Sequence, residues 1–107
     1  MDKKGLDNPQ ESNTIVYTIN WNPTKSERLK RIRGVSFEEI IHAKFIGLED
    51  HPSRHNQWIL VYEYKGHVWA VPFVIETGGI FLKTIYPSRK FKKIYSKRSH
   101  DEKNKTD

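Results

Sequence analysis

Three apolar segments, separated by turns of a few residues, place the strongest constraint on the fold of this chain. They span residues 57–64, 67–75 and 80–86, and each is rich in the β-branched and aromatic side chains that favour strands. Lys65-Gly66 separates the first two segments, and residues 76–79 separate the second and third. Connections this short join antiparallel neighbours, so the sequence predicts an antiparallel meander. Pro72 lies within the second segment and cannot donate a ladder hydrogen bond, so we expect that strand to end near Val71 or to contain a bulge.

The residues on either side of the meander predict one more strand and three helices. Residues 15–21 alternate apolar and polar side chains, as a half-buried strand does. Asn22 and Pro23 suit the start of a helix that ends before Gly34. The capping-box sequence S-F-E-E at residues 36–39 suits the start of a second helix that reaches about Phe45 and is stopped by Gly47. Residues 48–56 break both periodicities and predict a loop. After the meander, Ser88 can cap a short third helix with a buried stripe of Phe91, Ile94 and Tyr95.

This order, strand-helix-helix-strand-strand-strand-helix, predicts an α+β fold: an antiparallel sheet with the two N-terminal helices on one face. We expect a single domain at residues 14–96, a disordered lead at residues 1–13 and a disordered charged tail at residues 97–107. The strands are apolar on both faces, so the face that the two helices leave bare is covered either within the chain, by the third helix or the twist of the sheet, or by a partner protein. In the second case the contacts with the partner are Trp58, Tyr62 and Trp69.

The distribution of charge points to a polyanionic partner. The net charge is +6, and the segment from residue 88 onward contains eight Lys or Arg residues but only three acidic residues. A basic segment of this kind favours nucleic acid. The chain has no cysteine, which excludes disulfides and thiolate metal sites and suits a reducing cytoplasm. No apolar run approaches the roughly 18 residues of a transmembrane helix, so we expect a cytoplasmic protein with no membrane partner.

Two blocks of the sequence match a known pattern in both motif and spacing. The first contains W-N-P-x-K at residues 21–25 and G-V-S-F-E-E at residues 34–39; the second contains S-R-K at residues 88–90 and ends at Tyr95. They resemble the BrnT-type toxins, the ribonuclease components of bacterial type II toxin–antitoxin pairs, whose usual pattern is W-D-P-x-K, then H-G-V-S-F-E-E and a late S-A-R-K.

The resemblance covers roughly residues 17–95 and implies a RelE-like fold and RNA cleavage without a metal or other cofactor. It also implies neutralisation by a cognate antitoxin, commonly of the ribbon-helix-helix type, and repression of the shared promoter DNA by the complex. The chain departs from the pattern at Ile32 and Arg33, which replace the usual Lys-His before the glycine, and in the loop at residues 49–56. A histidine and a lysine that would serve in chemistry are therefore absent.

Candidate catalytic residues follow from what metal-independent RNA cleavage needs: a base for the 2′-hydroxyl, cations around the phosphorane and an acid for the leaving 5′ oxygen. Histidine suits proton transfer near neutral pH, and we predict His51 and His55 in the loop as base or acid. Arg89, at the junction of strand and helix, is predicted to stabilise the transition state, with Lys83 on the preceding strand. The predicted contacts with RNA phosphates are Lys25, Arg33, Arg54, Lys90, Lys92 and Lys93. The spacing of His51 and His55 falls in a proline-containing loop, so we predict no metal site.

Two other function classes fit the same sequence. In one, the chain holds RNA or DNA without cutting it and serves as a binding module or co-repressor. In the other, it is a structural protein whose charge only keeps it in solution.

Overall fold

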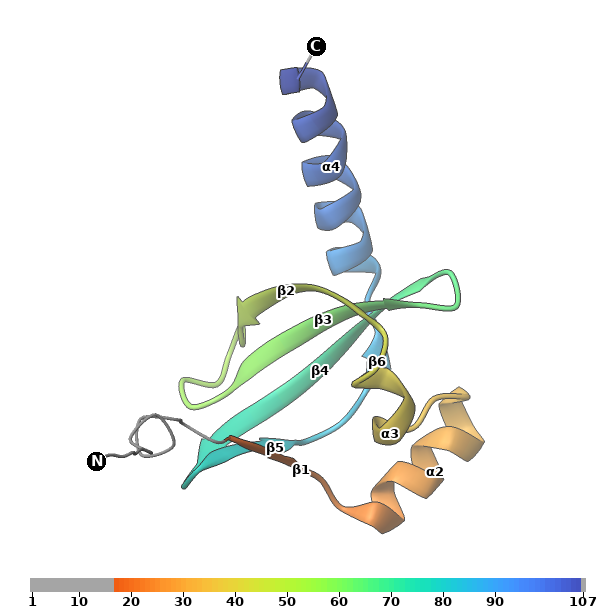
Figure 1. The fold of residues 1–107 in the computed structure, drawn as a ribbon, viewed down its shortest axis with the longest axis vertical. Helices are drawn as coiled ribbons and strands as arrows, with labels where there is room; N and C mark the ends of the chain where they lie inside the picture. The colour runs from red at the N-terminus through yellow and green to blue at the C-terminus, as the bar shows by residue number, and fades with distance from the viewer. Residues whose placement is uncertain (1–16, 107) are drawn as a thin grey trace, which may run out of the picture.

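The computed structural model describes residues 17–106, which form a mixed α+β fold with one six-stranded sheet (Figure 1). The elements in chain order are β1 (Thr18–Asn20), α2 (Pro23–Arg33), α3 (Phe37–Ile40), β2 (Lys44–Asp50), β3 (Trp58–Tyr64), β4 (His67–Glu76), β5 (Gly79–Leu82), β6 (Tyr86–Pro87) and α4 (Arg89–Thr106). None of the described helices has the length and apolar composition that crossing a membrane requires.

The predicted meander is confirmed. The strand order is β1-β5-β4-β3-β2, with β4 antiparallel to both of its neighbours, β3 and β5, and β6 paired with β4. Lys65 and Gly66 form the turn between β3 and β4 with φ of 52° and 77°. Two successive residues in the left-handed region match the twist of a two-residue hairpin, which explains the glycine. β1 adds to the outer edge of β5 in parallel orientation, with Thr18 opposite Gly79.

The prediction for residues 41–56 is wrong in part. The second helix ends at Ile40 instead of near Phe45, and strand β2, antiparallel to β3, takes in the end of that predicted helix and residues 48–50 of the predicted loop. Gly47, interpreted as a helix stop, serves another purpose. A Cβ atom there would lie 1.8 Å from the hydroxyl oxygen of Tyr95, so glycine lets α4 pack directly on β2.

Pro72 neither ends β4 nor causes a bulge, because it pairs in register with Ile59 of β3. Its carbonyl oxygen accepts a hydrogen bond from the amide of Lys83 at 2.8 Å, so the backbone polar groups of Pro72 face away from β3. These backbone groups face the residues between β5 and β6, where the chain no longer forms the regular hydrogen-bonded ladder with β4. The missing N–H therefore costs no ladder hydrogen bond.

Each face of the sheet has its own hydrophobic core. On one face α2, α3 and the connection between them supply Leu29, Val35, Phe37 and Ile40, which pack on the sheet. On the other face Phe91 of α4, with Ile94 and Tyr95 beside it, packs on Ile59, Val61 and Ala70. The third predicted helix, α4, therefore covers the face that α2 and α3 leave bare. This is the first of the two alternatives that the sequence left open, cover from within the chain.

This arrangement places the predicted partner contacts in or beside the core. Tyr62 and Trp69 are each only 7% exposed and belong to the core under α2 and α3, where burial raises the pKa of Tyr62. Trp58 is half-buried and packs against Phe73, with ring centroids 6.1 Å apart. These aromatic side chains stabilise the fold and offer little surface to a partner.

Helix α4 is longer than predicted, since helix extends to Thr106 where the sequence suggested a disordered tail from residue 97. Figure 1 shows its C-terminal turns projecting beyond the sheet. The Tyr95 hydroxyl donates a hydrogen bond to Glu49 of β2, and Arg98 lies 3.3 Å from the same carboxylate and over the Tyr95 ring. Burial, then the Glu49 carboxylate, raises the pKa of Tyr95. The predicted lead at residues 1–13 lies outside the described residues.

A buried serine connects α2 to α3. Ser26 is 1% exposed; its hydroxyl accepts a hydrogen bond from the amide of Phe37 at 2.9 Å and donates one to Glu38. The bond from Ser26 is the main reason that the pKa of Glu38 is lowered. Because Phe37 begins α3, this single hydroxyl sets how the two helices meet.

Replacing Ser26 with alanine should lower the free energy of unfolding by about 1–3 kcal/mol, because the buried amide of Phe37 loses its acceptor. Urea denaturation followed by circular dichroism measures this. Ser53→Ala, in the exposed β2–β3 loop, is the control and should change stability by less than about 0.5 kcal/mol. Equal stability of the Ser26→Ala and unsubstituted proteins would contradict this role for the hydroxyl.

Candidate nucleic-acid interface

Two adjoining pockets lie where the β3–β4 turn, β6 and the start of α4 meet. The first, which we call the hairpin pocket, has a volume of about 440 Å³ and is lined by Arg33, Gly34, Val35, Tyr64, Lys65, His67, Trp69 and Pro87. The second, which we call the helix pocket, has a volume of about 360 Å³ and is lined by His67, Val68, Pro87, Ser88, Arg89 and Lys92. The hairpin pocket opens on the face of the sheet under α2 and α3, and the helix pocket on the face under α4. His67 and Pro87 line both pockets, and we call the two pockets together the concavity.

The helix pocket owes its geometry to the junction between β6 and α4. The amide of Ser88 donates to the carbonyl oxygen of Val68 at 2.9 Å, which fixes the start of α4 beside β4. The Ser88 side chain caps the helix by accepting from the amide of Phe91 at 3.1 Å. Arg89 and Lys92, three residues apart, therefore stand on one side of the first turn, next to the positive end of the helix dipole.

Arg33 joins the hairpin pocket from the end of α2. Gly34 ends that helix in the left-handed conformation, with φ of 79°, and the Arg33 guanidinium donates to the carbonyl oxygen of Ile85. This bond holds the cation against the chain segment that leads into β6. Arg33 replaces the histidine of the family pattern, and because its guanidinium stays charged it can hold a phosphate but cannot act as a base.

The concavity is strongly electropositive. None of its lining residues carries a carboxylate. The ion pairs found among residues 17–98 lie elsewhere: Lys30–Glu39, Lys44–Glu63 and Arg98–Glu49. Arg33, Lys65, Arg89 and Lys92 are therefore not neutralised by acidic side chains in this part of the chain. Such a surface suits an anion that brings several negative charges.

A second group of cations extends the positive surface along α2. The pKa of Lys25 is lowered, first because the ammonium is partly buried and then by the neighbouring charges of Arg28, Lys83 and Arg33. Cations close enough to lower the pKa of Lys25 share its region of the surface. Lys83 follows β5 and lies over the Phe81 ring at 5.7 Å. Arg33 belongs to both groups and connects them.

The structure does not bring the predicted loop histidines to this site. His51 and His55 lie with Arg54 between β2 and β3, and this loop and the β3–β4 turn are at opposite ends of β3 (Figure 1). Seven residues of strand separate the two ends by about 20 Å. His51 also has a local role, since its Nδ1 accepts from the amides of Ser53 and Arg54 at 3.2 and 3.1 Å. The loop histidines are thus not partners of Arg89.

The other predicted cations fall into two groups, those that line a pocket and those that do not. Arg89, Lys92 and Arg33 line the concavity, whereas Lys90 and Lys93 are exposed on α4 and line neither pocket. The residue that sequence reasoning missed is His67. It is the first residue of β4, directly after the turn, and its side chain is exposed between the two pockets, with its ring edge-to-face against Trp69 at 6.1 Å. One sequence signal could have identified His67 as a candidate: it begins the second strand of the predicted meander, at the same end of the meander as Ser88.

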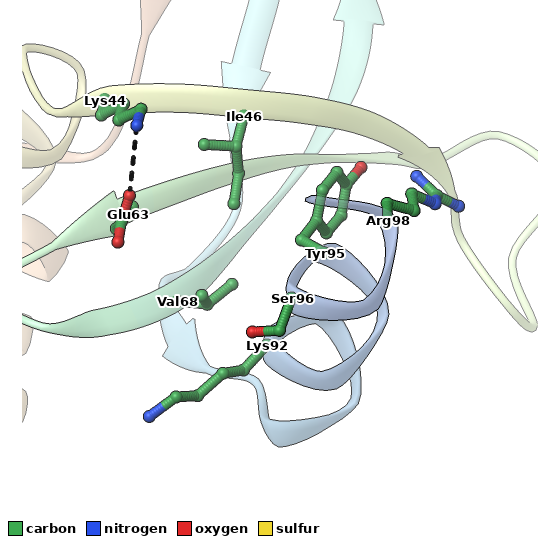
Figure 2. A pocket seen from close by; sticks show the side chains of 8 residues that line it. All are labelled: Lys44, Ile46, Glu63, Val68, Lys92, Tyr95, Ser96 and Arg98. Carbon is green, nitrogen blue, oxygen red and sulfur yellow. Dashed lines mark ion pairs between the residues drawn. The ribbon is translucent and has the colours of Figure 1, made fainter. Parts of the chain in front are cut away.

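A further hollow lies between α4 and strands β2 and β3 (Figure 2). Lys44 and Glu63 form an ion pair at 3.6 Å across it, and Tyr95 and Arg98 point into the region of Glu49. Figure 2 shows the Lys92 side chain extending away from Tyr95 and Arg98. Because carboxylates already neutralise this hollow, it is a weaker site for an anion than the concavity beside His67.

No protein-family model matches the chain, and no curated protein sequence matches it. Among solved structures, the chain is similar to the crystal structure of the Brucella abortus ribonuclease toxin BrnT. The likeness has a TM-score of 0.46 and 17% sequence identity, and it covers 70% of this chain and 100% of the toxin chain. Within the described residues, no group of three or more His, Asp or Glu side chains is arranged to hold a metal ion.

Lys92→Ala should weaken binding of a single-stranded RNA oligonucleotide and reduce the slope of log affinity against log salt concentration by about 0.7, the change expected for one lost phosphate contact. Lys93→Ala, the next residue of the same helix and outside both pockets, is the matched control and should leave the slope nearly unchanged. Fluorescence anisotropy over a salt series measures both variants. The same reduction for both lysines would show that binding depends on overall charge and not on this concavity.

Proposed function

We propose that this protein is a metal-independent RNA endonuclease that acts as the toxin of a type II toxin–antitoxin pair. One observation carries the proposal: the imidazole of His67 lies in the carboxylate-free helix pocket with Arg89 and Lys92, and it also lines the hairpin pocket that contains Arg33. These are the groups that transesterification of RNA needs around one phosphodiester. The W-N-P-x-K and G-V-S-F-E-E motifs, which resemble those of BrnT-type toxins, support the same activity.

The proposed reaction is an attack of the ribose 2′ oxygen on the adjacent phosphorus. His67 takes the proton from the 2′-hydroxyl, the bond from phosphorus to the 5′ oxygen breaks, and the leaving oxygen takes a proton from water. The products are a 2′,3′-cyclic phosphate and a 5′-hydroxyl. Arg89 and Lys92 hold the non-bridging oxygens, where negative charge grows, with the amide end of α4 beside them. The 2′-hydroxyl as nucleophile makes the reaction specific to RNA.

The cations along α2 extend this site. Lys83 and Arg33 lie within electrostatic reach of Lys25, whose pKa they help to lower. We assign them to phosphates of the RNA strand on the hairpin side of the cleaved bond. This role replaces the catalytic one that the sequence suggested for Lys83.

A binding module that does not cut is the second candidate. It is favoured by one observation: among residues 17–98, no hydrogen bond from another group orients the His67 imidazole. A general base is usually held by such a partner. In this alternative the same cations hold RNA or DNA, and the chain acts through the complex it forms.

We also propose that a cognate antitoxin of the ribbon-helix-helix type neutralises the protein in the cytoplasm, and that the complex binds its promoter DNA. The surface that suits such a partner is β2, the edge strand of the sheet. Phe45 and Leu48 project from it and are 54% and 59% exposed. An edge strand with exposed apolar side chains can pair with an added strand and bury those side chains.

His67→Ala should lower the rate of RNA cleavage by about 10²- to 10⁴-fold, because the base is removed while the phosphate contacts remain. Binding of RNA should change much less. The measurement is single-turnover cleavage of a labelled oligonucleotide, with the 2′,3′-cyclic phosphate product identified by mass spectrometry.

His55→Ala is the control for this prediction, since His55 lies in the distant loop and should leave the rate unchanged. A purified protein that binds RNA but never cleaves it would favour the binding module. Cleavage that survives in His67→Ala and disappears in His55→Ala would move the active centre to the loop.

Leu48→Lys should weaken the complex with the antitoxin by about tenfold or more, because it removes an exposed apolar contact from the edge strand and adds a charge. Co-purification with the product of the neighbouring open reading frame, followed by titration calorimetry, measures the change. Ile32→Lys replaces a residue that is also exposed, at 63%, but lies on α2, and it should not affect the complex. Unchanged affinity for Leu48→Lys would place the partner elsewhere.

A further inference from the structure

The hairpin pocket is a site of its own, because it opens on the face of the sheet under α2 and α3 while the helix pocket opens on the opposite face. Its rim carries three basic side chains, Arg33, Lys65 and His67, and none of its lining residues carries a carboxylate. Its floor is apolar, formed by Val35 and Trp69, which are 1% and 7% exposed. A ligand that suits this pocket therefore combines an anionic group with an apolar one.

The basic side chains of the rim keep hydrogen-bond donors for a ligand. The Arg33 guanidinium donates to the carbonyl oxygen of Ile85, and a guanidinium has five N–H donors in all. The Lys65 ammonium lies over the Tyr64 ring, 5.2 Å from its centroid, so a cation and an aromatic ring stand side by side in the pocket. Within the described part of the chain, Lys65 and His67 form no ion pair with a carboxylate.

The number of basic groups indicates which kind of anion fits. A phosphate monoester carries a charge of about −1.5 to −2 at pH 7. A carboxylate, or a phosphodiester within an RNA strand, carries only one negative charge. Three basic side chains around one small pocket are therefore best matched by a terminal phosphate.

The apolar walls of the hairpin pocket are held in place before a ligand binds. The indole N–H of Trp69 donates to the carbonyl oxygen of Tyr64 at 3.0 Å, and the Tyr64 hydroxyl donates to Glu39 at 3.4 Å. Glu39 is paired with Lys30 at 2.8 Å, so the charge of this carboxylate is already offset. A preformed site avoids the entropy cost of ordering its side chains on binding.

We propose that the hairpin pocket binds a nucleoside monophosphate unit, with the base in the apolar part of the pocket and the terminal phosphate at Arg33, Lys65 and His67. The unit is either a free nucleotide or the phosphorylated end of an RNA strand, since both present the same base and the same phosphate monoester. The pocket volume, about 440 Å³, falls within the range of roughly 300–1,000 Å³ typical of small-ligand sites. The inference goes beyond the proposed nuclease, because this pocket can hold a nucleotide whether or not RNA is cleaved in the helix pocket.

Protein-detected NMR on the full chain tests the site directly. The probes are AMP, CMP, GMP and UMP, compared with ribose 5-phosphate, which lacks a base, and with the four nucleosides, which lack a phosphate. We expect the nucleotides to shift the indole N–H signal of Trp69 and the backbone amide signals of residues 64–67. At least one nucleotide should bind about fivefold or more tightly than either of its partial ligands. The indole signals of Trp21 and Trp58, which lie outside both pockets, are internal controls.

Three further ligands test the charge and identify the source of the nucleotide. A dinucleotide joined by one phosphodiester, without a terminal phosphate and made with 2′-deoxyribose so that it cannot be cleaved, should bind about fivefold or more weakly than the best mononucleotide. If the same dinucleotide with a 5′-phosphate binds as tightly as the mononucleotide, the ligand is the end of a strand; if it binds more weakly, the ligand is a free nucleotide. N-acetylphenylalanine, an apolar ring with one carboxylate, should bind more weakly than the mononucleotide. Equal or tighter binding of N-acetylphenylalanine would assign the pocket to the end of a polypeptide and overturn the proposal.

Variants of the pocket provide an independent measurement. Lys65→Asn removes a cation, and asparagine tolerates the φ of 52° at this position, so the turn is kept. It should weaken binding of the best nucleotide by about fivefold or more and leave binding of the nucleoside unchanged. Lys93→Ala, outside both pockets, is the control and should change neither. Tyr64→Ala should reduce the affinity for the nucleotide to that for ribose 5-phosphate, whereas Tyr64→Phe keeps the ring and should retain the difference.

The possible results separate this site from the proposed nuclease. If the nucleotides bind as expected but RNA is never cleaved, the nucleotide site is supported and the nuclease is wrong. If RNA is cleaved but no nucleotide shifts the Trp69 indole signal, the nucleotide site is wrong and the nuclease is unaffected. The nucleotide site is also wrong if ribose 5-phosphate binds as tightly as the best nucleotide, or if Lys65→Asn leaves the affinity for the nucleotide unchanged.

Discussion

The attachment of α4 to β4 is the constraint on which the remaining structure depends. The short strand β6 pairs with Trp69 and Ala70, and the amide of Ser88 then donates to the carbonyl oxygen of Val68. A single hydrogen bond of this kind contributes only about 0.5–1.5 kcal/mol, so the burial of Phe91 against the sheet supplies most of the stabilisation. The same attachment places a helix N-terminus beside the first residue of β4. Core packing and the candidate site therefore have a common origin, because the junction that closes the second face of the sheet also creates the helix pocket.

Most of the fold could be predicted from local sequence signals. The meander, the Asn22 cap, the capping box and the Gly34 stop all arise from interactions within a few residues, and the structure has each of them. The error at β2 has a different origin. Phe45 and Gly47 satisfied the rules for the end of a helix, but their conformation is set by pairing with β3 and by the Tyr95 ring about 50 positions later in the chain. Contacts of that range leave no periodic signal in the sequence.

The candidate site could be predicted only in part, for the same reason. Arg89, Lys92 and Arg33 were identified because they belong to motifs or to a basic run. His67 was not, because its importance comes from register: it opens β4 next to the turn, where the strand returns to the start of α4. His51 and His55 appeared suitable because a loop with two histidines and an arginine resembles a catalytic loop. Only the length of β3 shows that this loop lies at the wrong end of the sheet.

The parallel pairing of β1 with β5 also has a consequence for how the chain folds. Thr18 meets Gly78 and Gly79 across about 60 residues, and only three residue pairs hold the two strands together. Closing a loop of that length costs about 3–4 kcal/mol of chain entropy, which a ladder this short repays only after the meander exists. β1 is therefore expected to join the sheet late in folding and to separate from it early during partial opening. β1 would then be the least protected strand of the sheet. Helix α2, which follows β1 directly, would be the helix most exposed to such local opening.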